Sequence, residues 1–193
     1  YISSLYGTKK NIWIGTDEGI YIYAYATETF TYFDLTTPNN VRITSIVNHI
    51  LQDKDGNLWF STNGQGLFRY NLSKNYLEQY EFTSAFGIVA STMADSDNQI
   101  WALTNQGESG VYKLNKAENK FEPFGLLYNA GNHHSQALAM LEDSEQTLWL
   151  GTWECGLQKI DKYTRQTTTY LHPTDGKGVT HIHSLMEYAP HQL

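Results

Sequence analysis

The chain has 193 residues, of which 40% are hydrophobic and 17% are charged, a balance that fits one globular domain or part of a larger one. Its formal net charge is −7 and no run of Lys or Arg stands out, which argues against nucleic-acid binding, because phosphate recognition needs a concentrated basic surface. The single cysteine excludes an internal disulfide framework and a cysteine-rich zinc site, and no stretch approaches the roughly 18 apolar residues of a membrane span.

A short pattern built on tryptophan recurs four times along the chain. Each copy reads tryptophan, an apolar or small residue, one variable residue and threonine, and a glycine with a branched apolar residue follows. The four tryptophans are Trp13, Trp59, Trp101 and Trp149, which lie 46, 42 and 48 residues apart. An aspartate stands six residues before three of them, at Asp53, Asp95 and Asp143. Such a period indicates a repeat protein.

Each repeat predicts four short strands joined by tight turns. Period-two alternation and many β-branched and aromatic residues favour strands, and Asp followed by Gly or Asn suits the connecting hairpins. Four antiparallel strands per repeat describe one β-propeller blade. We therefore expect an all-β fold, with each tryptophan packed between adjacent blades. The expected four-stranded antiparallel blades span 1–34, 43–81, 87–125 and 135–171.

The two ends of the chain suggest a fragment of a larger propeller. Residues 186–193 resemble residues 141–148, which lead into the fourth tryptophan, so 181–193 would be the first strand of a fifth blade. The chain begins with Tyr1 rather than Met and shows no signal-peptide pattern. In a four-bladed ring the fifth first strand would compete with residues 1–6. We therefore expect an open arc, or closure by partner chains, with association through exposed blade faces.

The second repeat resembles the two-component regulator propeller repeat. The resemblance rests on Asp-Lys-Asp-Gly-Asn-Leu-Trp-Phe-Ser-Thr at 53–62 and Gly-Leu-Phe-Arg-Tyr-Asn at 66–71. Departures are Gly7 in place of the aspartate, the extended turn 105–110, and Trp-Glu-Cys at 153–155. The absence of Gly-His, Trp-Asp and Gly-Gly pairs argues against WD40 and kelch repeats.

This resemblance implies a sensor segment rather than a self-contained enzyme. Proteins of this family carry such propellers in the periplasmic region of membrane-bound hybrid sensor histidine kinases of Bacteroides-type bacteria. It implies a periplasmic location, an oligosaccharide or other glycan-derived ligand, further blades in the parent chain, and a homodimeric parent. It implies neither nucleic-acid binding nor membrane contact by this segment.

One rim of the predicted propeller is the expected ligand site, because its loops converge on the channel mouth. Trp153 stands out there, since a large aromatic in that turn is not needed by the fold. Beside Glu154 it could stack on a sugar ring, although packing onto a neighbouring blade is the plainer alternative. The expected ligand-binding residues are Arg42, Gln65, Asn105, Asn132, His133, His134, Trp153 and Glu154.

No cofactor or metal site is expected. His181 and His183 share a face of a predicted strand and could bind zinc, but no clear third ligand accompanies them. Residues 53–56 resemble part of a calcium loop, yet the required downstream Glu is absent, so a hairpin turn explains them better.

Two other functions remain open. A propeller lyase or glycoside hydrolase would use His133, His134 and Glu154, provided that these groups converge on one substrate. A protein-interaction propeller without a small ligand would present a shallow apolar rim instead.

Overall fold

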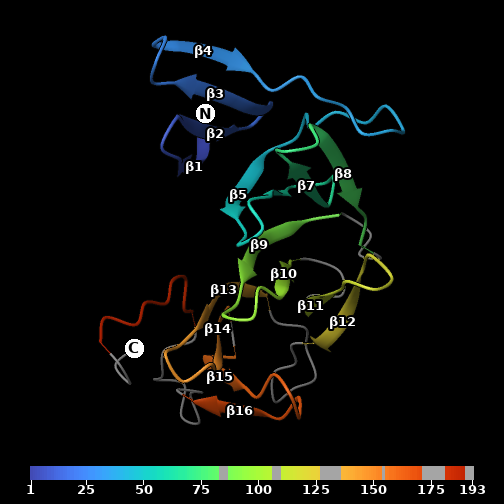
Figure 1. Ribbon diagram of the computed structural model, residues 1–193. Coiled ribbons are helices and arrows are strands. Elements are labelled where there is room, and N and C mark those ends of the chain that lie inside the picture. The colour runs from blue at the N-terminus through green and yellow to red at the C-terminus, as the bar shows by residue number, and fades with distance from the viewer. Residues whose placement is uncertain (83–86, 106–109, 127–135, 154, 171–180, 190–193) are drawn as a thin grey trace. The chain divides into compact units, whose positions relative to one another are not determined.

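The computed structural model describes residues 1–82, 87–105, 110–126, 136–153, 155–170 and 181–189 (Figure 1). Within these ranges the chain contains strands and turns and no α-helix, so no helix there could cross a membrane. The strands are β1 Ile2–Gly7, β2 Asn11–Thr16, β3 Gly19–Ala24, β4 Thr29–Tyr32, β5 Val47–Gln52, β6 Leu58–Thr62, β7 Leu67–Asn71, β8 Tyr76–Tyr80, β9 Val89–Ala94, β10 Ile100–Thr104, β11 Gly110–Asn115, β12 Lys120–Leu126, β13 Ala137–Glu142, β14 Leu148–Thr152, β15 Leu157–Ile160 and β16 Thr167–Tyr170.

The strands pair in sequence order into four four-stranded sheets, β1–β4, β5–β8, β9–β12 and β13–β16. We call these sheets blades 1 to 4. The pairings with an assigned register are antiparallel, so the expected fold of four-stranded antiparallel blades is confirmed. No named strand falls within the described residues 181–189, which follow blade 4.

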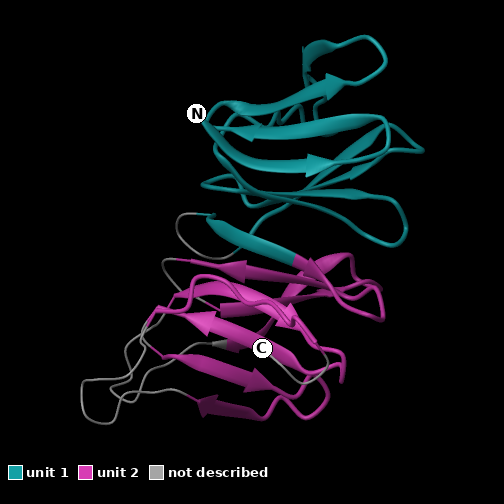
Figure 2. Cartoon of the chain, turned by 90° about the vertical axis from the view of Figure 1, so that its left-hand side faces the viewer, with its two compact units in different colours: residues 1–92 teal, residues 93–193 magenta. Residues whose placement is uncertain are grey.

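The chain divides into two compact units, residues 1–92 and 93–193 (Figure 2). Unit 1 contains blades 1 and 2 and the first part of β9. Unit 2 contains the end of β9, the rest of blade 3, and blade 4. Each unit has its own hydrophobic cluster.

The core of unit 1 lies between the facing sides of blades 1 and 2. The ring centroid of Trp13, in blade 1, is 5.8 Å from that of Phe60 and 5.9 Å from that of Tyr70, both in blade 2. Every residue of β6 is buried. The first indole therefore packs between adjacent blades, as its position in the repeat predicts.

Unit 2 repeats this arrangement with different side chains. Trp101 of blade 3 is fully buried and shares a cluster with Ala137, Leu148 and Leu150 of blade 4. Its ring also meets Phe124 edge-on, with the centroids 4.8 Å apart. Burial of large apolar side chains between two sheets is the main favourable term in such a stack.

Two glycines, each in the second strand of a blade, allow a later segment of the chain to approach that strand closely. A Cβ added at Gly15 in β2 would lie 2.8 Å from the carbonyl oxygen of Val47 in β5. A Cβ added at Gly151 in β14 would lie 2.5 Å from the carbonyl oxygen of Ile182. Neither approach leaves room for a side chain, so both positions require glycine. Ile182 therefore lies against β14 in the same way as Val47 lies against β2.

Candidate functional site

The aspartate that precedes three of the tryptophans joins the first hairpin turn to the indole. Asp53 Oδ2 accepts a hydrogen bond of 2.7 Å from Trp59 Nε1, while Oδ1 accepts the backbone N–H groups of Asp55 and Asn57. Asp95 and Asp143 make the same set of bonds, and their indole distances are 3.0 and 2.6 Å. The six-residue spacing between aspartate and tryptophan, which recurs in three blades, therefore has a structural cause.

A cation lies over the indole in the same three blades. The residue paired with the tryptophan across the second and third strands is Arg69 for Trp59, Lys113 for Trp101 and Lys159 for Trp149. Their charged groups are 5.7, 5.2 and 5.7 Å from the ring centroids. Such contacts favour a fixed ring orientation.

Blade 1 has neither feature. Gly7 stands where the other blades have aspartate, and Ile22 is paired with Trp13 where they have a cation. The Trp13 ring packs against Phe33 instead, with centroids 5.5 Å apart. Trp13 therefore has aromatic contacts, as the other three indoles do, but lacks their aspartate and cation.

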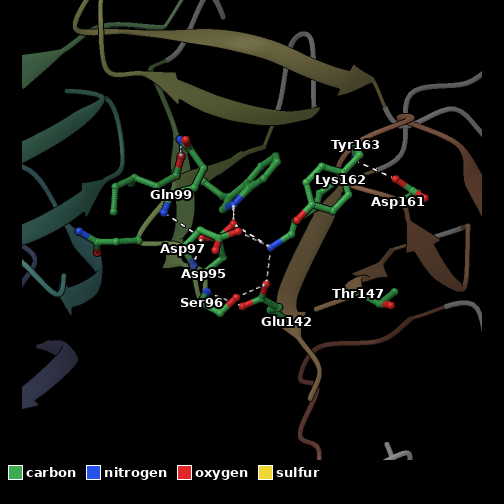
Figure 3. A network of polar contacts seen from close by, with 12 residues as sticks. Asp95, Ser96, Asp97, Gln99, Glu142, Thr147, Asp161, Lys162 and Tyr163 are labelled. Carbon is green, nitrogen blue, oxygen red and sulfur yellow. Dashed lines mark hydrogen bonds and ion pairs between the residues drawn. The ribbon is translucent and has the colours of Figure 1, made fainter. Parts of the chain in front are cut away.

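A buried lysine joins blades 3 and 4 within unit 2 (Figure 3). Lys162 follows β15, and its Nζ is 2.7 Å from Glu142 Oε1, 3.2 Å from Asp97 Oδ2 and 3.6 Å from Asp95 Oδ2. The Lys162 side chain is only 4% exposed. Since Asp95 also holds the Trp101 indole, the network ties the hairpin turn of blade 3 to blade 4.

The three carboxylates keep Lys162 charged despite its burial. Burial by itself lowers the pKa of the Lys162 ammonium. The hydrogen bonds to Glu142 and Asp97, together with the charge of Asp95, outweigh that effect and hold the pKa above its ordinary value. A permanently charged lysine surrounded by acceptors suits structural pairing better than proton transfer.

Trp153 follows β14 directly and is 42% exposed. Its ring meets the rings of His181 and His183 edge-on, with centroid distances of 4.1 and 5.8 Å. Packing thus accounts for one side of the indole, while part of it stays open to solvent. The structure brings both histidines that the sequence offered as zinc ligands to this one tryptophan.

Gln65 and Arg42 hold the loop that leads into blade 2. Gln65 Oε1 accepts the backbone N–H groups of Thr44 and Ser45, and Gln65 Nε2 donates to Arg42 O. The Arg42 guanidinium is 2.8 Å from Asp34 Oδ1. These contacts give Gln65 a structural role in unit 1.

The Asn105 side-chain amide lies beside the carbonyl oxygens of Thr104 and Ala137, in unit 2, and its nitrogen donates to both in the orientation that satisfies them. The other expected ligand-binding residues, Asn132, His133, His134 and Glu154, lie outside the described residues. Within the described ranges, no group of three or more His, Cys, Asp or Glu side chains is placed to hold a metal ion.

Sequence reasoning missed the Lys162 network and a groove between blades 1 and 2. The network joins Lys162 to residues as far as 65 positions away, so local patterns do not reveal it. The groove has a volume of about 520 Å³ and is lined by Trp13, Tyr70 and Leu72 among others. Its one sequence signal is the pair of departures at Gly7 and Ile22, which single out the first repeat.

Comparison with known proteins supports the expected resemblance. Residues 40–64 match the profile of the two component regulator propeller. No curated protein matches the chain.

Solved structures share the fold. Two structures of the extracellular domain of BT4673 from B. thetaiotaomicron, described in one as a one component system and in the other as a hybrid two component system, are 23% and 19% identical to the chain, with TM-scores of 0.69 and 0.76. The alignments cover 87% and 96% of this chain but only 22% and 24% of those domains. This chain therefore spans about a quarter of their length.

Virginiamycin B lyase from Staphylococcus aureus is 18% identical with a TM-score of 0.70, and the alignment covers 92% of this chain and 57% of the lyase. Similarity at these identities shows a shared fold and not a shared activity. The four sheets are thus β-propeller blades, and residues 40–64 carry a two component regulator propeller repeat.

Proposed function

We propose that this chain is part of the extracytoplasmic, ligand-sensing propeller of a two-component regulator and that it responds to a glycan-derived ligand. The observation that carries the proposal is the match of residues 40–64 to the two component regulator propeller. The fold it shares with extracellular domains described as parts of hybrid two component systems supports the same role. Trp153, which is partly exposed beside His181 and His183, is the rim group best suited to stack on a sugar ring.

Signalling by such a propeller requires a difference in affinity between two states. A ligand that bound both states equally would shift nothing, however tightly it bound. The ligand would therefore favour one arrangement of two protomers of the parent, and that bias would pass to the output domain.

A thermal-shift experiment tests the glycan proposal. The purified protein is heated alone and with each member of a panel of neutral and acidic oligosaccharides. A ligand that binds only the folded state raises Tm, by an amount equivalent to about 2.7 kcal/mol at a concentration one hundred times Kd. No shift with any member would count against a glycan ligand.

The lyase alternative rests on the fold it shares with virginiamycin B lyase. The histidines and the glutamate that could serve it, His133, His134 and Glu154, lie outside the described residues. Cleavage of any substrate by the purified protein, lost on replacement of these residues, would favour it over the sensor.

A further inference from the structure

The groove between blades 1 and 2 has the size and lining of a small-molecule site. Its volume of about 520 Å³ falls within the roughly 300–1,000 Å³ typical of ligand pockets. Aromatic and aliphatic side chains alternate with a few polar ones around it. The lining includes Trp13, Ile22, Phe33, Tyr70, Leu72 and Asn75.

A matching groove between blades 3 and 4 shows what the fold usually places there. That groove measures about 350 Å³, and cations line it. Lys113 Nζ lies 5.2 Å from the ring centroid of Trp101, and Arg165 Cζ lies 5.1 Å from that of Phe124. The chain itself thus supplies the groups that cap the aromatic rings in unit 2.

The first groove has uncharged residues at the equivalent positions. Ile22 is paired with Trp13 as Lys113 is paired with Trp101. Asn75 closes the turn after β7 with a φ of 48°, and Arg165 occupies the same turn position after β15 with a φ of 63°. The two cations that lie over aromatic rings in the second groove, Lys113 and Arg165, are therefore replaced by smaller neutral side chains, and the first groove is the larger.

The floor of the first groove is a cluster of three aromatic rings. The centroid of Phe33 is 5.5 Å from that of Trp13 and 5.0 Å from that of Tyr70. Trp13 and Phe33 are almost fully buried, whereas Tyr70 is half-buried and Leu72 is 41% exposed. Tyr70 and Leu72 are thus the apolar surfaces that a ligand in the groove can reach.

Polar groups with both donor and acceptor capacity line the edge. Asn11 and Asn75 carry amides, and Tyr70 Oη donates to Asn75 Oδ1 at 2.9 Å. Burial raises the pKa of Tyr70, so its phenol stays neutral at physiological pH. Asp34 is the one charged side chain among the described residues that line the groove, and Arg42 already pairs with it.

We propose that this groove binds a neutral saccharide unit. The apolar face of a pyranose ring would pack on Tyr70 and Leu72, and its hydroxyls would bond the amides of Asn11 and Asn75 and the carboxylate of Asp34. A charged ligand fits less well, since the only charge on the lining is already paired. The inference rests on the proposed glycan-sensing function and places a ligand site away from Trp153.

Substitutions that copy the second groove into the first provide the test. Ile22→Lys with Asn75→Arg introduces into the first groove the cations that Lys113 and Arg165 provide in unit 2. Binding of cellotriose, maltotriose and xylotriose is measured by isothermal titration calorimetry in the purified protein. The trisaccharide that binds the wild-type protein should bind this variant at least about tenfold more weakly, which is a loss of about 1.4 kcal/mol.

A second groove variant and two further substitutions separate a loss of binding from a loss of folding. Leu72→Lys changes an exposed side chain and should weaken binding by a similar factor without lowering Tm. Lys116→Gln, which alters the exposed edge of the groove in unit 2, should leave the affinity unchanged. Trp153→Ala, at the other candidate contact, tells the two sites apart, because loss of affinity in that variant alone would place the saccharide at Trp153.

The outcomes separate this inference from the proposed function. Full affinity in both groove variants, or loss of affinity in Trp153→Ala alone, would overturn the groove as the site while leaving a glycan sensor intact. Failure of all three trisaccharides, combined with a Tm shift by an acidic oligosaccharide, would overturn the neutral-saccharide groove only. Failure of the whole panel would remove both.

Discussion

At the scale of single residues, the two carboxylate oxygens of one aspartate accept different hydrogen bonds in each of three blades. Oδ1 closes the first hairpin turn, and Oδ2 orients the indole six residues later. The sequence revealed the spacing of Asp53 and Trp59 but not its reason, because a turn-forming aspartate needs no distant partner.

Asp53→Ala should destabilise unit 1 by at least about 3 kcal/mol. The change leaves a buried indole N–H and two backbone N–H groups without their acceptor, and each such loss costs about 1–3 kcal/mol. Urea denaturation would measure the effect. Asp55→Ala, in the same turn but exposed, serves as the matched control and should change stability by less than about 0.5 kcal/mol.

Lys162→Met should destabilise unit 2 by about 3–5 kcal/mol, because it leaves Asp95 and Glu142 buried together without their cation. Adding Glu142→Gln should recover part of the loss. Urea denaturation of the single and double variants would measure both effects. A double variant no more stable than the single one would show that the carboxylates do not repel one another.

His49 should make unit 1 sensitive to mild acid. Burial lowers its pKa, and its Nδ1 accepts the Thr92 N–H at 3.4 Å. The unfolded chain then binds a proton at about pH 6.5 before the folded chain does. Stability is complete above that pH and falls below it, by at most about 1.4 kcal/mol per pH unit.

Comparison of urea midpoints at pH 7.5 and 5.5 would measure this contribution. His49→Asn keeps an acceptor for Thr92 and removes the titration, so the variant should lose less stability on acidification than the wild-type protein. Equal losses in the two proteins would mean that other groups carry the acid sensitivity.

At the scale of elements, the serine that follows Asp95 or Asp143 donates hydrogen bonds to a glutamate of the next repeat, a contact we call the serine–glutamate clasp. Ser96 Oγ donates to Glu142 at 3.0 Å, and the Ser144 backbone N–H and hydroxyl both donate to the Glu187 carboxylate at 2.7 Å. The alignment of 186–193 with 141–148 pairs these two glutamates. It could not show that they reach back to the preceding blade, since that contact depends on how sheets stack.

Glu187→Ala should loosen residues 181–189 from blade 4. The Ile182 N–H, which donates to Thr152 O at 3.0 Å, should exchange with solvent at least about tenfold faster, since opening that segment would become about 1.4 kcal/mol easier. Hydrogen exchange followed by NMR would measure this. Met186→Ala, at a neighbouring exposed residue, should leave the exchange rate unchanged.

At the scale of the whole molecule, the period of the tryptophans predicted the number and type of sheets. The predicted strands and hairpins are local, so alternation and turn residues suffice for them. The Lys162 network and the groove at Trp13 are not local. They depend on which faces of adjacent blades meet, and side chains from separate repeats decide that.

Blade 1 exposes apolar residues at positions that are covered in blade 2. Leu5 and Tyr21 are 63% and 37% exposed, whereas Ile50 and Phe68, which hold the same places in the register of blade 2, are 4% and 0% exposed. Phe30 adds to this face at 65% exposure. A patch of this kind favours association.

The protein should therefore associate as its concentration rises, and Leu5→Lys with Phe30→Lys should shift it toward the monomer. Sedimentation velocity at several concentrations would follow the change. Tyr163→Lys, at another highly exposed aromatic residue, should leave association unaffected. Loss of association in this control as well would point to net charge rather than to the face of blade 1.

The serine–glutamate clasp also has a temporal consequence. Ser96 precedes its glutamate by 46 residues, and Ser144 precedes its own by 43. During synthesis the turn of one repeat therefore waits for its final bonds until the rest of its own repeat and the first strand of the next have left the ribosome. The turns of blades 3 and 4 would therefore complete their bonds about one repeat behind the point of elongation, which gives the assembly of unit 2 a direction from the N-terminus onward.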